Sequence, residues 1–224
     1  PEWNNETCIG CNKCAFVCPH ATIRPFAMSA DEAANAPANT KTAVKEKTVT
    51  TKGYTYTLAV SPLDCMGCGV CAGVCPTKSL KMVNRETQED QQAVFDYCVA
   101  NVTEKADTTA VINAITSQYK KPLLEFSGSC AGCAGTSYAR LVTQLFGDRM
   151  YISNATGCSS IWGGPAATSP YTTNAKGQGP AWANSLFEDN AEHGLGMYLG
   201  QKSIRDRLKG QIEEMAASDK ASAE

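Results

Sequence analysis

Eight of the twelve cysteines in this 224-residue chain fall into two runs of identical spacing. Each run reads C-x-x-C-x-x-C-x-x-x-C-P, and Cys8 of the first run lies 57 positions before Cys65 of the second (65 − 8). Three cysteines spaced three apart can wrap one face of an iron–sulfur cubane, while the fourth, beside a chain-turning proline, ligates the cluster of the other run. We therefore predict two [4Fe–4S] clusters with crossed ligands: Cys8, Cys11, Cys14 and Cys75 for cluster 1, and Cys18, Cys65, Cys68 and Cys71 for cluster 2.

Other thiol chemistries explain these runs less well. Structural zinc also favours C-x-x-C pairs, but it gives no reason for a third cysteine three residues on or for the Cys-Pro step. Disulfide frameworks are typical of small secreted modules, and this chain is long and its cysteines are unevenly placed. Within the predicted sites, we expect the backbone N–H groups of Gly10, Gly67 and Gly69 to donate to cluster sulfurs, which tunes the reduction potential.

Three more cysteines lie in loops rich in small residues: Cys130, Cys133 and Cys158. We expect them to converge as an incomplete third [4Fe–4S] site, whose fourth ligand lies outside this chain. A redox C-x-x-C of the thioredoxin type is the alternative, but it explains neither Cys158 nor the density of glycine. Cys98 stands alone within a helical pattern, so we expect a small buried hydrophobic residue rather than the missing ligand.

The segment between the two runs, residues 27–60, is longer than a minimal two-cluster ferredoxin needs. Ser29, with Glu32 three residues later, has the pattern of a capping box and predicts the start of a helix. Alternating residues around Gly53, from 48 to 60, predict a hairpin. An inserted segment of this kind is typical of a docking surface within a larger assembly.

Residues 86–121 read as a linker with helices, for which the spacing of apolar residues predicts the ranges 93–101 and 108–119. From residue 122 the pattern is α/β. It predicts, in order, a strand at 123–126, a helix with the apolar positions Tyr138, Leu141, Val142, Leu145 and Phe146, a strand at 150–153, and a late helix at 203–217 with Ile204, Leu208, Ile212 and Met215 on its apolar face. Because each cysteine loop follows a strand, we expect both loops on the rim where open α/β sheets bind cofactors.

Four other side chains have less specific patterns. His20 follows a Cys-Pro step and could tune a cluster, but we expect a surface loop histidine. His193 is predicted to be a helix-end residue rather than a base. Trp162 and Trp182, both near Gly and Pro, either line a cofactor wall or pack a loop, and the sequence leaves both readings open.

The overall composition excludes several classes of partner. Lys and Arg number 20 against 22 Asp and Glu, for a net charge of −2, so no general electrostatic attraction to nucleic acid or an anionic membrane is expected. No apolar run approaches the ~18 residues of a membrane span, and the first residues have no signal-peptide profile. Thiolate chemistry predicts a reducing, cytoplasmic location. The absence of an initial Met suggests a processed product or a piece of a longer chain.

Taken together, the motifs resemble pyruvate:ferredoxin (flavodoxin) oxidoreductases. The resemblance covers nearly the whole chain. Its most specific parts are L-L-E-F-S-G-S-C-A-G-C, L-F-G-D-R-M, N-A-T-G-C-S-S-I-W-G and G-Q-G-P-A-W-A-N-S-L-F-E-D-N-A-E. It implies an α+β ferredoxin-like two-cluster domain over residues 1–85, with residues 27–60 inserted. A linker would follow over 86–121, and then the opening, over 122–224, of an α/β domain that binds thiamine diphosphate.

The resemblance also implies a reaction. Pyruvate would be oxidatively decarboxylated on thiamine diphosphate with Mg²⁺, coenzyme A would take the acetyl group, and the clusters would pass electrons to ferredoxin or flavodoxin. Cys130, Cys133 and Cys158 would hold the cluster nearest the thiamine, and Gly135 and Cys158 would lie in its vicinity. The rest of the same long polypeptide would complete the site, in an anaerobic cytoplasmic enzyme that we expect to be a homodimer.

Some features of that family are absent from this sequence. The Gly-Asp-Gly…Asn stretch that holds Mg²⁺ and the pyrophosphate does not appear, and Gly135 stands where the family has an acidic residue. We therefore expect this chain alone not to turn over pyruvate. The alternative function is a non-catalytic iron–sulfur electron-carrier subunit of another redox complex, which the two cysteine runs by themselves fit equally well.

Overall fold

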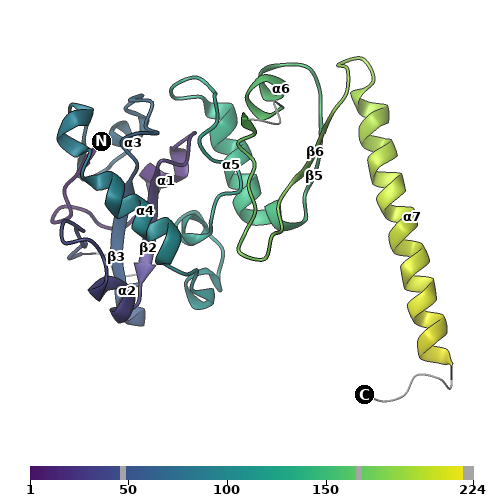
Figure 1. The fold of residues 1–224 in the computed structure, drawn as a ribbon, viewed down its shortest axis with the longest axis horizontal. Coiled ribbons are helices and arrows are strands. Elements are labelled where there is room, and N and C mark those ends of the chain that lie inside the picture. Colours follow the sequence, from purple (N-terminus) through teal and green to yellow (C-terminus); the bar gives the residue numbers. More distant parts are fainter. Residues whose placement is uncertain (46–48, 165–167, 219–224) are drawn as a thin grey trace.

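A computed structural model describes residues 1–45, 49–164 and 168–218. Figure 1 shows a first region that carries α1 to α4 and β1 to β4, a second region built around α5, α6, β5 and β6, and a long helix, α7, that extends away from both. Among the described residues, no helix has the length and apolar character that spanning a membrane requires. The limits of the predicted domains stay predictions.

The two cysteine runs fold as copies of one unit. The third cysteine of each run lies in a short helix, Cys14 in α1 (Lys13–Val17) and Cys71 in α3 (Val70–Gly73). Strand β1 (Glu2–Trp3), before the first run, pairs with β4 (Leu80–Lys81), after the second. Positive φ angles recur at the same three positions of each copy: 63° at Gly10 and 68° at Gly67, 55° at Asn12 and 75° at Gly69, 56° at Ala21 and 52° at Lys78. The repeat seen in sequence is therefore also a repeat of backbone conformation.

A two-stranded antiparallel sheet forms the centre of this region. β2 (Ile23–Met28) pairs along its whole length with β3 (Thr55–Val60), in the register Ile23↔Val60. Tyr56 and Leu58 of β3 are buried against Trp3 and the cluster cysteines. The predicted hairpin around Gly53 is therefore wrong: Thr50–Lys52 is a 3₁₀ turn, β3 takes its partner from β2, and Thr48 lies outside the described residues.

Two predicted helices of this region are confirmed. α2 (Ala30–Ala34) has both hydrogen bonds of the capping box between Ser29 and Glu32. α4 (Gln91–Asn101), preceded by the 3₁₀ turn Arg85–Gln88, covers the sheet, and Cys98 is 0% exposed among Met28, Ala59, Val94 and Phe95. Cys98 is thus the small buried residue that its pattern indicated, and burial raises its pKa to about 12.

The predicted helix over 108–119 is wrong. The segment contains two 3₁₀ turns instead, Ala106–Thr109 and Thr116–Tyr119. Between them, Oδ1 of Asn113 accepts from the N–H groups of Ile115 and Thr116, at 2.8 and 3.0 Å. Such side-chain to backbone bonds compete with the bonds of a helix, so the apolar spacing did not determine the structure.

The second region has one parallel pair of strands. β5 (Tyr151–Asn154), expected from sequence, pairs with β6 (Ala181–Asn184), which was not, and α6 (Cys158–Gly163) begins the connection between them. The predicted strand at 123–126 is absent: Leu124 makes only an isolated bridge to Tyr171, because φ at Phe126 is 53° and leaves the extended region. The two cysteine loops therefore do not follow neighbouring strands of one sheet.

α5 (Ala134–Phe146) is confirmed as a helix, but it does not bury the apolar stripe that predicted it. Tyr138, Val142 and Phe146 are 71%, 41% and 48% exposed. The face of α5 that packs inward carries polar residues: Thr136, Arg140, Thr143 and Gln144. The 3₁₀ turn Gly147–Arg149 follows, at a point where a Cβ on Gly147 would lie 2.9 Å from Leu123.

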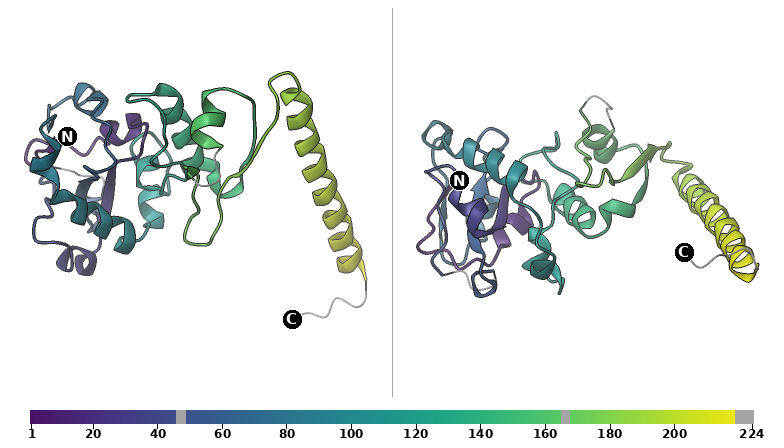
Figure 2. Two further views of the ribbon diagram at one scale, coloured as in Figure 1. Left: turned by 45° about the horizontal axis from the view of Figure 1, so that its top comes forward. Right: turned by 60° about the horizontal axis from the view of Figure 1, so that its bottom comes forward.

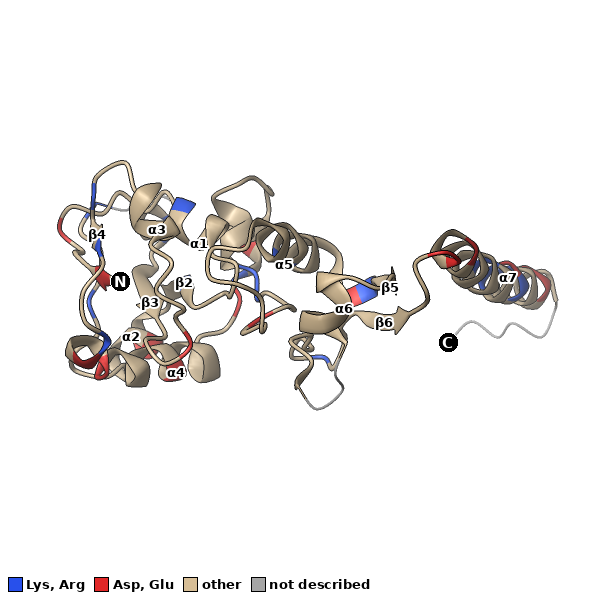
Figure 3. Cartoon of the chain, turned by 90° about the horizontal axis from the view of Figure 1, so that it is seen from above, with Lys and Arg blue, Asp and Glu red and all other residues tan. Residues whose placement is uncertain are grey.

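α7 (Asn190–Ala217) is longer than the predicted 203–217 and has no buried residue. Figure 2 shows it projecting from the body in both views, and Figure 3 shows charges of both signs along its length. The four residues of its predicted apolar face, Ile204, Leu208, Ile212 and Met215, are 45–68% exposed. Its beginning contacts β5, where Nδ1 of His193 lies 2.7 Å from Oγ of Ser153.

Candidate iron–sulfur centres

The four cysteines expected for cluster 1 line one small cavity in the first region. Cys8 and Cys11 come from the loop that enters α1, Cys14 lies within α1, and Cys75 reaches the cavity from the second run. The remaining wall is mostly apolar and includes Trp3, Ile9, Tyr56, Leu58 and Leu80. Four thiols around a small, mostly apolar space are the ligand set that a [4Fe–4S] cluster requires.

The four cysteines expected for cluster 2 line a second cavity in the same way. Cys65, Cys68 and Cys71 lie before and within α3, and Cys18 comes from the first run, so the exchange of the fourth cysteine is reciprocal. Pro19, His20, Ile23, Val70 and Met82 complete most of the wall. No three His, Cys, Asp or Glu side chains of the described ranges are grouped so that they could hold a single metal ion; the thiols surround a space instead.

Burial disfavours the thiolate form of two of the predicted cluster ligands. Burial raises the pKa of Cys14 well above its usual value and that of Cys71 to about 11. Neutral thiols bind iron poorly, so binding must release these protons and becomes coupled to the charge of the iron. The N–H of Gly10 donates to Sγ of Cys8 at 3.4 Å, as expected, and that of Ser79 to Sγ of Cys75 at 3.2 Å; the predicted bonds from Gly67 and Gly69 stay predictions.

The third set of cysteines lies on two separate elements of the second region. Cys130 is exposed in the loop before α5, Cys133 is half-buried at the N-cap of α5, and Cys158 is exposed at the first residue of α6. The loop and α6 lie on the same, upper side of this region in Figure 1. A backbone hydrogen bond from Thr136 lowers the pKa of Cys133, although burial opposes it. Their joint ligation of a third cluster stays a prediction.

We call the cavities of clusters 1 and 2 cavity 1 and cavity 2. The loop that carries Cys130 packs directly against cavity 2. At Gly132, where φ is +74°, a Cβ would lie 3.4 Å from Cγ2 of Val70 and 3.6 Å from Cβ of Cys68. His20 lies in the same contact and is 2% exposed, with Nδ1 3.0 Å from the carbonyl of Ser127 and Nε2 3.3 Å from that of Cys130. The expectation of a surface histidine is therefore wrong: the turn after Cys-Pro is covered by a segment more than 100 residues away.

Arg140 joins the two regions from α5, and sequence reasoning missed it. Its side chain is buried, and Nε donates to the carbonyl of Cys18 at 2.9 Å and Nη2 to that of Phe16 at 2.7 Å. Burial lowers its pKa to about 10, so it stays protonated at neutral pH. The one signal in the sequence was a single arginine in a helix whose apolar residues lie on a different face. A search for hydrophobic periodicity does not detect such a residue.

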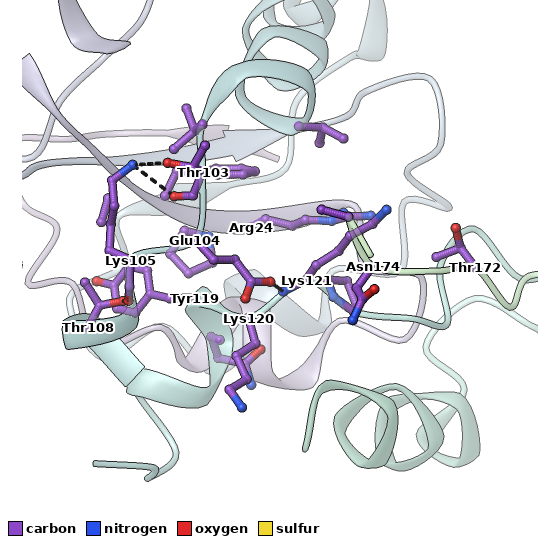
Figure 4. Close-up of a pocket in the computed structure, with 18 of the residues that line it drawn as sticks. Arg24, Thr103, Glu104, Lys105, Thr108, Tyr119, Lys120, Lys121, Thr172 and Asn174 are labelled. Atoms are coloured by element: carbon purple, nitrogen blue, oxygen red, sulfur yellow. Dashed lines mark hydrogen bonds between the residues drawn. The ribbon is translucent and has the colours of Figure 1, made fainter. Parts of the chain in front are cut away.

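A larger groove lies at the junction of the two regions, apart from the cysteine cavities. Figure 4 shows Arg24, Glu104 and Lys121 lining it, with Asn174 from the loop that precedes β6. Its cations are largely engaged: Arg24 pairs with the carboxylate of Glu125, and Nζ of Lys121 donates to the carbonyl of Thr173 at 3.0 Å. No cysteine lines this groove.

Trp162 and Trp182 pack a loop of the second region. The ring of Trp162 lies 6.5 Å from that of Tyr171, and a Cβ on Gly164 would lie 3.0 Å from Trp182. Of the two readings that the sequence left open, the structure therefore provides direct contacts for packing. His193 lies in the first turn of α7, as predicted, with Nδ1 2.7 Å from Oγ of Ser153.

Comparison with known proteins agrees with this arrangement. Residues 7–79 match the family model of the 4Fe-4S dicluster domain. The chain is 55% identical over 223 residues to a pyruvate-flavodoxin oxidoreductase of Enterobacter agglomerans, and 49% identical over 219 residues to a pyruvate:ferredoxin oxidoreductase of Moorella thermoacetica. These alignments cover 99% and 96% of this chain but 18% of each relative.

A mitochondrial pyruvate dehydrogenase [NADP(+)] of Euglena gracilis is 46% identical over 209 residues, which cover 93% of this chain and 12% of that protein. The chain is thus homologous, over nearly all its length, to one segment of these oxidoreductases, and it spans less than a fifth of their length. The resemblance seen in the motifs is confirmed at that level, and the 4Fe-4S dicluster match covers residues 7–79 of the first region.

Proposed function

We propose that this chain is the electron-transfer segment, and the start of the thiamine-diphosphate domain, of a pyruvate:ferredoxin or pyruvate-flavodoxin oxidoreductase. The complete enzyme would decarboxylate pyruvate oxidatively with coenzyme A to acetyl-CoA and CO₂, and pass the electrons through three [4Fe–4S] clusters to ferredoxin or flavodoxin. The observation that carries this proposal is the pair of four-cysteine cavities with exchanged fourth ligands, within a chain homologous to those enzymes.

The chain's own residues would hold the clusters and keep water from them. In cavity 1, Trp3 and Tyr56 are 5% and 1% exposed and cover the thiols. In cavity 2, the loop around Gly132 lies against Cys68 and Val70. Bound clusters supply reversible one-electron chemistry. Because the loop of Cys130 touches cavity 2, we infer that electrons enter the dicluster domain at cluster 2 and leave through cluster 1.

Thiamine diphosphate with Mg²⁺ would supply the decarboxylation chemistry, near Gly135 and Cys158. A Cβ on Gly135 would meet only Sγ of Cys133, at 3.7 Å, an ordinary contact. Gly135 is smaller than the acidic residue of the family, and a Cβ at this position would not clash with the loop. We further propose a cytoplasmic homodimer in which the rest of the polypeptide completes the site.

The carrier-subunit alternative has less support. A carrier needs only the first region, whereas this chain joins its dicluster domain to the second region through buried contacts of His20 and Arg140. The homologous segments of the oxidoreductases extend over both regions.

Iron analysis tests the proposal directly. Anaerobic purification of the chain should give about eight iron and about eight acid-labile sulfide per chain, and the reduced sample should show interacting paramagnetic signals from two clusters. Bound zinc, with no visible charge-transfer absorption, would overturn the cluster assignment. In the complete polypeptide, Cys158→Ala should lower the iron content by about four atoms, because the third cluster is lost. The matched variant Cys98→Ala should leave the iron content unchanged.

A further inference from the structure

Arg140 carries a buried positive charge that the proposed function does not by itself require. The residue is 2% exposed and comes from α5, in the second region, yet two of its donors bind carbonyls of the first region, at Phe16 and Cys18. Cys18 is the fourth cysteine of cavity 2. The guanidinium therefore lies against the backbone of a predicted cluster ligand.

The other hydrogen-bond partners of Arg140 are also neutral. Nη1 donates to Oε1 of Gln118 at 3.1 Å and to Oε1 of Gln144 at 2.7 Å, so its four acceptors are two carbonyls and two amides. Arg24, a second buried arginine, pairs instead with the carboxylate of Glu125. A charge removed from water without an opposite charge is costly, so the site of Arg140 calls for a negative partner, and none of the side chains that the structure describes forms an ion pair with it.

We propose that Arg140 is a positioning residue whose charge compensates the cluster held at Cys18 and raises the reduction potential of that cluster relative to the cluster held at Cys75. The proposal rests on the proposed function, because it needs a cluster in cavity 2. A [4Fe–4S] cluster with four thiolates is an anion, and it is the one partner expected here that could balance a guanidinium at a ligand backbone.

The electron balance is simple. Addition of one electron from a low-potential one-electron donor makes the site more negative by one charge, and no bond forms or breaks. A fixed positive charge in a poorly solvated place stabilises the reduced state more than the oxidised state. Because Arg140 belongs to the second region, this stabilisation exists only when the loop of Cys130 and α5 are docked on the first region.

Three substitutions separate charge from shape. Arg140→Gln removes the charge and can keep part of the hydrogen bonding. Arg140→Lys keeps the charge and loses most of the hydrogen bonds. Gln118→Glu keeps Arg140 and places a carboxylate at its Nη1 atom, where the Ser117 hydroxyl, now 3.2 Å from Nε2 of Gln118, can turn to donate to the new oxygen.

The measurement is a redox titration of the anaerobically purified full chain, followed by electron paramagnetic resonance. Cys11→Ser and Cys68→Ser first identify which signal belongs to cluster 1 and which to cluster 2. Arg140→Gln and Gln118→Glu should both shift cluster 2 to lower potential, with cluster 1 unchanged as the internal reference. Arg140→Lys should leave cluster 2 closer to the wild-type potential than Arg140→Gln does.

Each outcome decides something. If Arg140→Gln and Gln118→Glu assemble both clusters and leave the potential of cluster 2 at its wild-type value, the proposal is wrong while the proposed function stands. If Arg140→Gln does not assemble cluster 2, Gln118→Glu decides alone. A wild-type chain without cluster signals would instead contradict the proposed function.

Discussion

In the first region the strands β2 and β3 and the helix α4 bury aromatic and aliphatic side chains, including Tyr56, Leu58 and Phe95. In the second region, α5 turns threonine, glutamine and arginine inward and leaves Tyr138 in solvent. Both regions have helices with apolar stripes, but only the first uses them for a core of its own. Within the described residues, nothing covers the apolar side chains on the surface of α5 or on most of α7.

This difference indicates which interactions stabilise each region. The first has a hydrophobic core and, when clusters bind, two links between its halves, because each cluster would take one of its four cysteines from the other run. The second is held to the first by polar contacts over long sequence separations, such as Ser137 Oγ to the carbonyl of Val17 at 3.0 Å. Exposed apolar stripes on α5 and α7 fit a segment that packs against further protein.

The largest effect is expected from breaking the exchange of ligands. In Cys75→Ala, cavity 1 keeps three cysteines of its own run but loses the one from the other run, so iron should fall from about eight to about four per chain. Iron and sulfide analysis of the anaerobic protein measures it. Cys98→Ala is the control: it should cost about 1 kcal/mol of stability through its cavity and keep all iron. Unchanged iron in Cys75→Ala would contradict the crossed assignment.

A second contrast concerns backbone protection. Amide hydrogens of β3 lie in a paired strand with a buried face, whereas α7 has no buried side chain. Exchange in α7 should therefore be about 100-fold faster, or more, than at Tyr56 and Leu58. α4, which buries Val94 and Cys98, is the helical control and should resemble β3. Equal protection of α7 and α4, measured by mass spectrometry, would mean that α7 is already covered, for example by a second copy.

Sequence reasoning reached what depends on local spacing. The cysteine runs, the capping box of α2 and the helices α4 and α5 each depend on residues within one or two turns of each other. It failed where a partner lies far along the chain. β3 pairs with β2 rather than with the segment just before Gly53. His20 and Arg140 are buried by segments more than 100 residues away. Periodicity cannot show which face of α5 turns inward when polar bonds decide it.

The third contrast is a half-buried ion pair between Glu32 and Lys105, whose side chains are 14% and 12% exposed. Burial raises the pKa of Glu32, but hydrogen bonds from Lys105, Thr103 and Ser29 outweigh it and lower the pKa to about 2. An unfolded glutamate titrates at about 4.3, so this stabilisation is complete above about pH 5 and is lost as the pH falls towards 2. Glu32→Gln should therefore cost roughly 1–2 kcal/mol at pH 7, and less as the pH falls.

Denaturant unfolding at several pH values measures this difference. Glu213→Gln is the matched control in α7, where the carboxylate is 67% exposed and lies 3.7 Å from Lys209. That exposed pair should contribute less than about 0.5 kcal/mol. A cost for Glu32→Gln that grows as the pH falls would contradict the low pKa, and equal costs for the two variants would contradict the contrast between the regions.

The smallest effect compares two glycines of the same loop and helix. Gly135 is the second residue of α5, and a Cβ there makes only an ordinary contact, so Gly135→Ala should stabilise the protein by about 0.5 kcal/mol by restricting the unfolded chain. Gly132 has φ of +74° and faces Val70 and Cys68 of cavity 2, so Gly132→Ala should destabilise by about 1–2 kcal/mol. Thermal unfolding of both variants gives the sign of each change in stability. The same sign for both would mean that the loop does not dock as described.

Proteolysis gives a second readout. Because Gly132 lies at the contact between the regions, its substitution should also loosen the loop of Cys130 and speed proteolysis there, whereas Gly135→Ala should not.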